Sequence, residues 1–367
     1  MTGVTPLTVR RPEDLDEGWL SGALASGGLL EAGQAVHSFG IEPVGTGQMA
    51  DTVRIRYRTG SGAPEAERSV VAKFASADEQ SRSTGLMTRA YEIEVAFYEA
   101  IARRVGIRTP ACYFGQYEPE TGWFVLLLED VVGGVPGEQL AGCSPEAAEA
   151  ALAELAALHG TAWARPELAR LPWLHRGGPK ADTFLVTVIT SLWPDFLQRY
   201  GPRLDAEHRD ACDRFVGQLA PWLATRPGPT TVTHGDFRVD NLLFPPGQGR
   251  PSVVDWQTTA WGAAAADVSY FLGASLTVEH RRQHGERLVA GYHRALVDHG
   301  VEGFTLDRLV HEYRATCAGG LVMSIGAAML VSRTERGDDM FVTSVARYAQ
   351  QALDLEAEAT LPSGAGR

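Results

Sequence analysis

The sequence predicts an α+β chain of two lobes, a β-rich N-terminal lobe over residues 1–129 and a mainly helical C-terminal lobe over residues 130–367. A chain of 367 residues is too long for one small core and favours two packed units. Short apolar runs between turn residues dominate the first third of the chain, and helical patterns dominate after GGVPG at 133–137. The order of these patterns distinguishes the two lobes.

The N-terminal lobe is expected to be a sheet with one crossing helix. PEDLDEGWLSGALAS at 12–26 predicts an amphipathic helix whose acidic first turn suits the positive end of the helix dipole. Apolar residues recur at helical spacing in 88–105, which predicts the crossing helix. Strands are expected at 39–45, at 51–59, at 69–75 and twice within 109–130.

In the C-terminal lobe, a helix is expected to begin at residues suited to a helix start. Ser144 is a good N-cap, and Pro145 suits the first helical position. The run HGDFRVDNLLF at 234–244 then interrupts the helical pattern. LLF and SVVDW are short apolar strands joined by a Pro/Gly turn, so the polar run is expected to be a loop that enters a small hairpin. The far end of this hairpin delivers Asp255.

Composition narrows the range of partners. A formal net charge of -12 and a pI near 5.3 disfavour nucleic acid and anionic membranes, which require basic surfaces. The four cysteines are far apart with no CxxC pair, a pattern that fits a reducing cytoplasm. The longest apolar run, at 318–331, is too short to cross a bilayer. We therefore expect a cytoplasmic protein with a small-molecule partner and with no nucleic-acid, membrane or obligate protein partner.

Lysine is unusually rare in this chain. Of the 33 basic residues only Lys73 and Lys180 are lysines, and Lys73 lies at the centre of the apolar strand SVVAKFA. A compact ammonium and a forked guanidinium are not interchangeable at a binding site, so a lysine at this strand position indicates a specific role. The structural alternative is a lysine that extends along the strand to solvent.

The hairpin brings three polar side chains within reach of one point. Magnesium takes oxygen ligands, commonly carboxylates together with substrate phosphates, so Asn241 and Asp255 suit a Mg2+ ion that holds a nucleotide. Asp236 can then accept a proton from an attacking hydroxyl. These are the parts of a phosphoryl-transfer site.

The same residues form a known motif. His234, Gly235, Asp236 and Asn241 match HGDxxxxN, and VVDWQ follows at 253–257. The chain therefore resembles the aminoglycoside phosphotransferase superfamily, which includes choline kinases and ecdysteroid-kinase-like proteins and shares the two-lobed protein-kinase-like fold. The resemblance extends over residues 35–275.

This resemblance implies roles for the residues of the loop and hairpin. Asp236 would be the catalytic base, and Asn241 and Asp255 would be the metal ligands. His234 would hold the shape of the loop. Arg238, two positions after the base, would contact phosphate or instead face the substrate.

The resemblance also implies a nucleotide-binding role for the N-terminal lobe. Lys73 resembles the strand lysine that contacts the α and β phosphates of ATP. Its partner would be a glutamate of the helix YEIEVAFYE, with Glu94 favoured and Glu92 as the alternative.

Two further segments of this lobe resemble parts of a nucleotide site. GTGQMADT at 45–52 occupies the place of the phosphate-covering loop, where Gly45 and Gly47 would let backbone N–H groups approach phosphates. LLLEDVVGG at 126–134 resembles the hinge whose backbone meets the adenine edge, and Glu129 lies within it.

The function implied by the resemblance is transfer of the γ-phosphate of MgATP to a hydroxyl of a small molecule. Residues 175–215 are expected to supply an amphipathic lid over this acceptor, with a large apolar share that favours a bulky, antibiotic-like alcohol. The lid residues are Trp193, Phe196, Leu197 and Tyr200. A hydroxyacyl thioester or a choline-like metabolite is the alternative acceptor, and an inactive nucleotide-binding pseudokinase is the alternative function.

Three other polar residues are expected to be structural. Asp240 is typical of a turn. Asp267 resembles a family position that braces the catalytic loop by hydrogen bonding. His159 is expected to pack within its helix or to line a cleft.

Overall fold

The computed structural model describes residues 8–45, 49–59, 67–175, 177–247, 249–331 and 333–361. The chain forms two compact units. Unit 1 comprises residues 1–103, 109–133 and 254–258, and unit 2 comprises residues 104–108, 134–253 and 259–367. The short segment 254–258 therefore belongs to unit 1, although its neighbours in sequence belong to unit 2. The functional division at residue 129 stays a prediction.

Unit 1 is built on a five-stranded antiparallel sheet with the strand order β1-β2-β3-β5-β4. Alternate residues of a strand point to opposite faces, and in β3 the buried Val70, Ala72 and Phe74 share one face. Lys73 therefore points to the other face. The strands are β1 (Val36–Pro43), β2 (Ala50–Thr59), β3 (Arg68–Ala75), β4 (Cys112–Glu118) and β5 (Trp123–Glu129).

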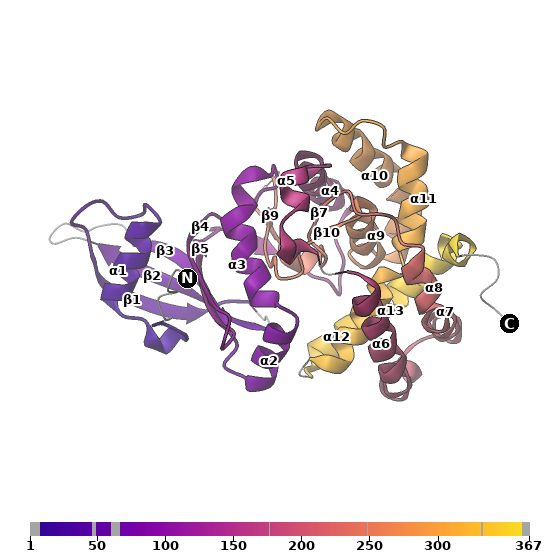
Figure 1. Cartoon of the computed structure of the whole chain (residues 1–367), viewed down its shortest axis with the longest axis horizontal. Coiled ribbons are helices and arrows are strands. Elements are labelled where there is room, and N and C mark those ends of the chain that lie inside the picture. The colour runs from indigo at the N-terminus through magenta and orange to yellow at the C-terminus, as the bar shows by residue number, and fades with distance from the viewer. Residues whose placement is uncertain are drawn as a thin grey trace. The chain divides into compact units, whose positions relative to one another are not determined.

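Helices cover both faces of this sheet (Figure 1). On one face α1 buries Leu20 and Leu24 in the apolar cluster that contains Ala72 of β3. On the other face α3 packs on β4 and β5, where the ring of Tyr91 stacks on Phe124 at 4.5 Å. The helices of unit 1 are α1 (Glu17–Ser26), α2 (Glu79–Met87) and α3 (Ala90–Ala100), with the short 3-10 turn η1 (Pro12–Asp14) before them.

Two helices of unit 1 differ from the sequence expectation. The first helix begins at Glu17 because the side chain of Asp16 accepts a hydrogen bond from the backbone N–H of Trp19 and caps it there, whereas Pro12–Asp14 forms a 3-10 turn. The helix α2 was not expected. Its N-cap is Asp78, which accepts from the N–H of Ser81.

Unit 2 is mainly helical. Ser144 caps α4 as expected, since its hydroxyl oxygen accepts from the N–H of Ala147. The helices are α4 (Pro145–Ala162), α5 (Pro166–Ala169), α6 (Pro179–Tyr200), α7 (Ala206–Gly217), α8 (Leu219–Ala224), α9 (Ala264–Ala274), α10 (Val278–Asp298), α11 (Leu306–Thr316), α12 (Gly319–Leu330) and α13 (Glu335–Asp354). The short 3-10 turns of unit 2 are η3 (Pro172–Leu174), η4 (Gly201–Arg203), η5 (Val239–Asn241) and η6 (Ala357–Thr360), and η2 (Ala102–Arg104) spans the boundary between the units in the sequence.

Two small sheets complete unit 2. In the three-stranded sheet, β8 pairs with β9 in the expected hairpin, with Leu242 opposite Val253. The loop 234–241 leads directly into β8. The strands are β6 (Val135–Pro136), β7 (Thr231–Thr233), β8 (Leu242–Phe244), β9 (Ser252–Val253) and β10 (Ala260–Gly262), and β10 pairs with β7.

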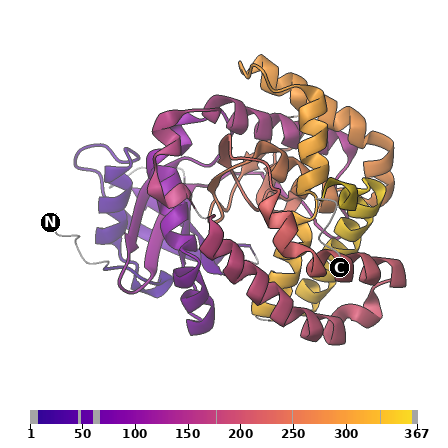
Figure 2. The ribbon, with the colours of Figure 1, turned by 45° about the vertical axis from the view of Figure 1, so that its right-hand side comes forward.

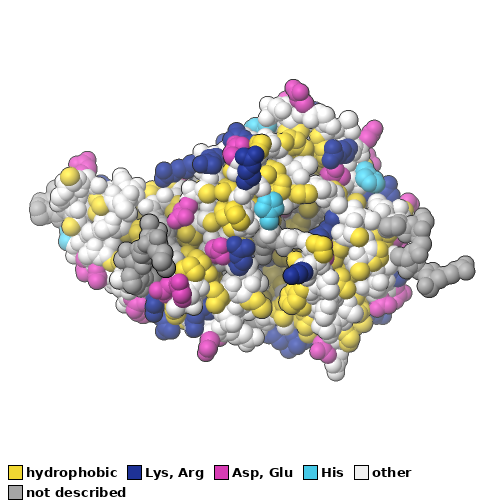
Figure 3. All heavy atoms as spheres, in the orientation of Figure 1, with side chains coloured by type: hydrophobic (Ala, Val, Ile, Leu, Met, Phe, Trp, Pro, Cys, Tyr) yellow, Lys and Arg dark blue, Asp and Glu magenta, His cyan; other side chains and the backbone are white. Residues whose placement is uncertain are grey.

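The core of unit 2 lies among α6, α7, α8, α12 and α13, and α6 and α12 lie side by side in Figures 1 and 2. On the face shown in Figure 3, the described basic and acidic side chains are interspersed rather than gathered into one basic surface. In the described ranges, none of the helices combines the length and apolar composition needed to cross a membrane.

Candidate active site

In unit 1, Lys73 of β3 is held between two carboxylates. Its Nζ lies 2.8 Å from Oε1 and 2.7 Å from Oε2 of Glu94, and it donates to Oδ1 of Asp255 at 2.8 Å. The side chain of Glu94 is only 1% exposed and that of Lys73 is 13% exposed. Burial disfavours the ammonium, but the carboxylates of Asp255 and Glu94 outweigh burial and raise the pKa of Lys73 above its ordinary value. The two carboxylates therefore favour the charged form of Lys73.

The helix partner of Lys73 is Glu94. The sequence left Glu92 as an alternative, but the Glu92 carboxylate pairs instead with Arg89, at 2.7 Å from Nη2. Successive helical residues are rotated by about 100°, so two glutamates that are two positions apart point to nearly opposite sides of α3. Only Glu94 points to the sheet face that carries Lys73.

Asp255 is fixed by the tryptophan that follows it. The indole of Trp256 is fully buried and stacks on Phe97 of α3 with ring centroids 3.7 Å apart, and its Nε1 donates to Thr109 Oγ1 at 3.0 Å. Phe97 lies three residues after Glu94, so one face of α3 positions both the glutamate and the segment that carries Asp255. Asp255 has φ +68°, in the left-handed region that aspartate tolerates better than most residues.

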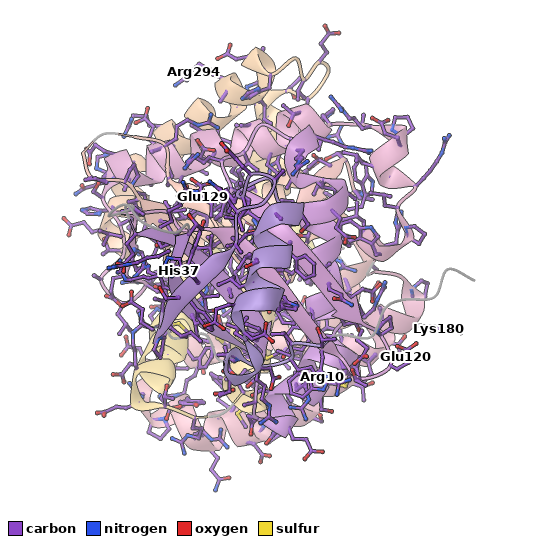
Figure 4. The ribbon with its side chains drawn as sticks, turned by 90° about the vertical axis from the view of Figure 1, so that its left-hand side faces the viewer. Arg10, His37, Glu120, Glu129, Lys180 and Arg294 are labelled. Carbon is purple, nitrogen blue, oxygen red and sulfur yellow. The ribbon has the colours of Figure 1, made fainter. Side chains whose placement is uncertain are left out.

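The predicted phosphate-covering and hinge residues lie in different parts of the sheet. Gly45 follows β1 with φ +77°, a conformation that favours glycine, and a side chain there would meet open space. Gly47 lies outside the described residues. Glu129, which is labelled in Figure 4, is the last residue of β5 and accepts through Oε2 from the N–H of Ala111 at 3.1 Å.

In unit 2, the backbone of the HGD loop is braced by Asp267 of α9. The carboxylate accepts from the N–H of His234 at 2.7 Å and from the N–H of Gly235 at 2.9 Å. His159 Nε2 lies 3.2 Å from the same carboxylate. Burial opposes ionisation of Asp267, but the hydrogen bonds from His159 and from the N–H of Gly235 hold its pKa below the ordinary value. Asp267 is thus placed as expected for a brace of this loop.

The loop itself has a conformation that its residues favour. Gly235 has φ +81°, which glycine adopts without strain. The buried imidazole of His234 accepts from the N–H of Asp236 through Nδ1 at 3.2 Å. His234 therefore shapes the loop from inside and presents Asp236 at its turn.

The Asp236 carboxylate lies at the centre of a hydrogen-bond cluster. Its Oδ2 accepts from Asn241 Nδ2 at 3.1 Å and from Arg238 Nε at 3.3 Å, and its Oδ1 accepts from Tyr270 Oη at 2.6 Å. Because Nδ2 of Asn241 is turned toward Asp236, its amide oxygen is the atom that suits a hard cation. Arg238 also donates to Asp240 Oδ2 at 3.2 Å.

Two further residues lie near Asp236. One of them had only a structural expectation from the sequence, and the other was not identified from it. Asp240 accepts from the N–H of Gln139 at 2.8 Å and so joins the loop to the segment before α4. Tyr270 was missed altogether. The spacing to Asp267, three residues earlier on the same helix, was the sequence signal that could have pointed to it.

The expectation of an aromatic lid over the acceptor is wrong. Trp193, Phe196 and Tyr200 of α6 are buried in the core of unit 2, and Leu197 packs against that core. Tyr200 also donates to Asp338 of α13 at 2.7 Å. The amphipathic pattern of α6 was recognised correctly, but its apolar face stabilises the unit instead of lining a binding site.

Unit 1 carries a strand lysine paired with a helix glutamate, and unit 2 carries an HGDxxxxN loop at a small hairpin. With a five-stranded sheet in one unit and mostly helices in the other, these features define a phosphotransferase of the protein-kinase-like class. The sequence profile of the phosphotransferase enzyme family (APH) matches residues 41–306, more than half of the chain. The chain belongs to this family, and the predicted family, fold class and enzyme class are confirmed.

Among solved structures, the chain is similar to choline kinase from Cryptosporidium parvum. The two share 11% sequence identity with a TM-score of 0.53, over 88% of this chain and 92% of the choline kinase chain. At this identity the similarity concerns the fold alone.

Two curated proteins match a short part of the sequence. Acyl-CoA dehydrogenase family member 11 of Gallus gallus is 38% identical over 60 residues, and family member 10 of Mus musculus is 41% identical over 61 residues. These segments cover 15% and 16% of this chain. They span only 8% and 6% of the length of the two relatives.

Proposed function

We propose that the chain transfers the γ-phosphate of ATP to a hydroxyl group of a small molecule. The observation that carries this proposal is the Lys73 ammonium, which is held by Glu94 and Asp255 in a chain that otherwise uses arginine almost throughout. A buried cation fixed by two carboxylates is suited to meet the phosphates of a nucleotide. The HGDxxxxN loop supplies Asp236, the proposed acceptor of the hydroxyl proton.

The two residues proposed as metal ligands suit a magnesium ion by their chemistry. Asp255 of unit 1 offers a carboxylate and Asn241 of unit 2 an amide oxygen, which are hard donors of the kind that magnesium prefers together with nucleotide phosphates. In the described residues, no group of three or more His, Cys, Asp or Glu side chains could by itself hold a metal ion. When bound, magnesium offsets the negative charge of the phosphates.

In the transfer step, the acceptor hydroxyl loses its proton and forms a bond to phosphorus. The acceptor hydroxyl gives its proton to the Asp236 carboxylate, and its oxygen forms a bond to the γ-phosphorus. The bond from the γ-phosphorus to the bridging oxygen breaks, and ADP leaves with that electron pair. Lys73 holds the α and β phosphates during this exchange. Arg238 steadies the base or contacts phosphate, and His234 keeps the loop in shape.

The nucleotide is proposed to bind through backbone groups of unit 1 as well. Backbone N–H groups near Gly45 and Gly47 would contact phosphates, and the backbone around Glu129 would meet the adenine edge. Glycine at residue 45 is supported by its positive φ.

The acceptor is proposed to be a small-molecule alcohol. Bulky, antibiotic-like alcohols form the first class of candidates. Hydroxyacyl thioesters form the second class. They are favoured by the two curated relatives, whose names refer to acyl-CoA. The burial of the α6 aromatics removes the argument from an apolar lid, so neither class is preferred on that ground.

A thermal-shift titration first tests whether the folded chain binds a nucleotide. ATP, GTP and ADP are added with and without Mg2+, because a ligand that binds the folded state raises its apparent stability. We expect a Mg2+-dependent rise with ATP. Release of ADP is then followed by a coupled assay with hydroxylated antibiotics, hydroxyacyl-CoA thioesters and choline. Nucleotide binding without turnover on any acceptor would favour the pseudokinase alternative, and no binding at all would contradict the proposed function.

A further inference from the structure

The Asp236 carboxylate has an asymmetric set of hydrogen-bond partners within unit 2. A carboxylate oxygen has two lone pairs, and Oδ2 accepts from two donors, Asn241 Nδ2 and Arg238 Nε. Oδ1 accepts from the Tyr270 hydroxyl at 2.6 Å. The second lone pair of Oδ1 is therefore the position at which an acceptor hydroxyl can donate.

Tyr270 lies on the helix that also braces the loop backbone. Asp267 and Tyr270 are three residues apart on α9, so their side chains leave the same face of the helix. Asp267 fixes the backbone of His234 and Gly235, and Tyr270 fixes the side chain of Asp236. One turn of α9 thus determines both where the loop runs and how its carboxylate is rotated.

We propose that Tyr270 is a positioning residue for the base, which holds the Asp236 carboxylate in the rotation that presents Oδ1 to the acceptor hydroxyl. The expected effect on kcat rests on the proposed function. The expected effect on the rotation of the Asp236 carboxylate rests only on the geometry of unit 2. Tyr270 itself exchanges no proton in the reaction.

A tyrosine hydroxyl is suited to this task because it orients the Asp236 carboxylate by a hydrogen bond without neutralising its charge. It is an uncharged donor, and burial together with the Asp236 carboxylate raises the pKa of Tyr270 well above its ordinary value. Its backbone carbonyl accepts from the Tyr348 hydroxyl at 2.9 Å, and the two rings lie 5.5 Å apart. The ring therefore has a fixed place from which to donate.

The orientation of the carboxylate matters because of how phosphoryl transfer is catalysed. In this reaction the transition state is loose and the protein acts mainly by positioning and charge. Removal of the hydroxyl is therefore expected to slow turnover. An increase in turnover would overturn the proposal.

The test compares Tyr270→Phe with Tyr200→Phe. Both variants remove one hydroxyl that donates to an aspartate, but only the first hydroxyl contacts Asp236, because that of Tyr200 donates to Asp338. We expect Tyr270→Phe to lower kcat by about 10-fold with unchanged KM for MgATP, and Tyr200→Phe to keep the wild-type kcat. Tyr270→Phe should have no further effect in an Asp236→Asn background, because a residue that acts through the base cannot act without it. Additive losses, or wild-type kcat in Tyr270→Phe, would contradict the proposal.

A second measurement does not depend on activity. Crystal structures of the wild type and of Tyr270→Phe are compared, and the Asp236 carboxylate is expected to rotate away from its wild-type position in the variant. An unmoved carboxylate would overturn the positioning role. If the wild type transfers phosphate to none of the acceptors, the proposed function fails, while this structural comparison still decides the role of Tyr270.

Discussion

The two units hold the carboxylates of their candidate residues in different ways. In unit 1, Asp255 and Glu94 are both in ion pairs with Lys73, and Glu94 is almost completely buried. In unit 2, Asp236 is held by two uncharged donors, Tyr270 and Asn241, and by one guanidinium at 3.3 Å. The first cluster is held by short ion pairs to one ammonium, whereas the second is held mainly by neutral donors and by a longer contact to one guanidinium.

Under the proposed function, this difference corresponds to a division between nucleotide binding and phosphoryl transfer. A buried cation between two carboxylates keeps its charge and its place, which suits it to hold phosphates of either substrate or product. A carboxylate held mainly by neutral donors keeps the capacity to accept a proton. Substitutions in the two clusters should therefore affect different measured quantities.

The largest effect is expected from Asp236→Asn. The amide keeps the size of the side chain but cannot accept the proton, so kcat should fall by about 100-fold to 10,000-fold. The affinity for MgATP, measured by calorimetry, should stay close to that of the wild type. A wild-type kcat in this variant would exclude Asp236 as the base. It would also contradict the proposed difference in role between the two clusters.

Asp255→Asn should change binding instead of the chemical step. Asparagine tolerates the left-handed backbone at residue 255, so the substitution removes the charge with little strain. Loss of one charged contact to the metal should weaken MgATP binding by about 10-fold to 100-fold, while affinity for metal-free ATP changes less. Equal MgATP affinity in variant and wild type would exclude Asp255 as a metal ligand.

Lys73→Arg sharpens the argument from lysine usage. The charge is kept, but the planar guanidinium cannot occupy the position of an ammonium that lies within 2.8 Å of both Glu94 and Asp255. We expect kcat/KM for MgATP to fall by about 10-fold. Lys180→Arg is the matched control, because Lys180 is exposed on α6 and the variant should behave as the wild type. Identical kinetics in both variants would indicate that Lys73 supplies only charge.

The smallest effect is expected from Phe97→Leu. The variant loses the ring that stacks on Trp256, which should lower the free energy of unfolding by about 1 kcal/mol. Phe184→Leu is the control, because Phe184 is 64% exposed and its ring should contribute little. Urea unfolding of the two variants measures this difference. Equal stabilities would show that the stacked pair does not fix the segment that carries Asp255.

The sequence alone was sufficient for the features that depend on local patterns. The strands of unit 1, the capped start of α4 and the hairpin after the HGD loop all follow from alternation, turn residues and capping, which act over a few residues. Composition singled out Lys73 as a candidate residue, since only one other lysine occurs in the chain.

The features that the sequence left open or misassigned depend on how helices are rotated and docked. The choice of Glu94 over Glu92 depends on which face of α3 meets the sheet. The contact of Tyr270 with Asp236 joins residues that are 34 positions apart. The apolar face of α6 was evident from its periodicity, but the core of unit 2 and an acceptor pocket would use the same pattern.

The sequence by itself therefore determined which residue types are available for phosphoryl transfer and on which local elements they lie. The tertiary structure decided which of them meet, because side chains far apart in the chain come within hydrogen-bond distance only when the elements that carry them pack against each other. Lys73, Glu94 and Asp255 come from a strand, a helix and the segment after a hairpin, and it is the burial of Trp256 against α3 that fixes the last of these.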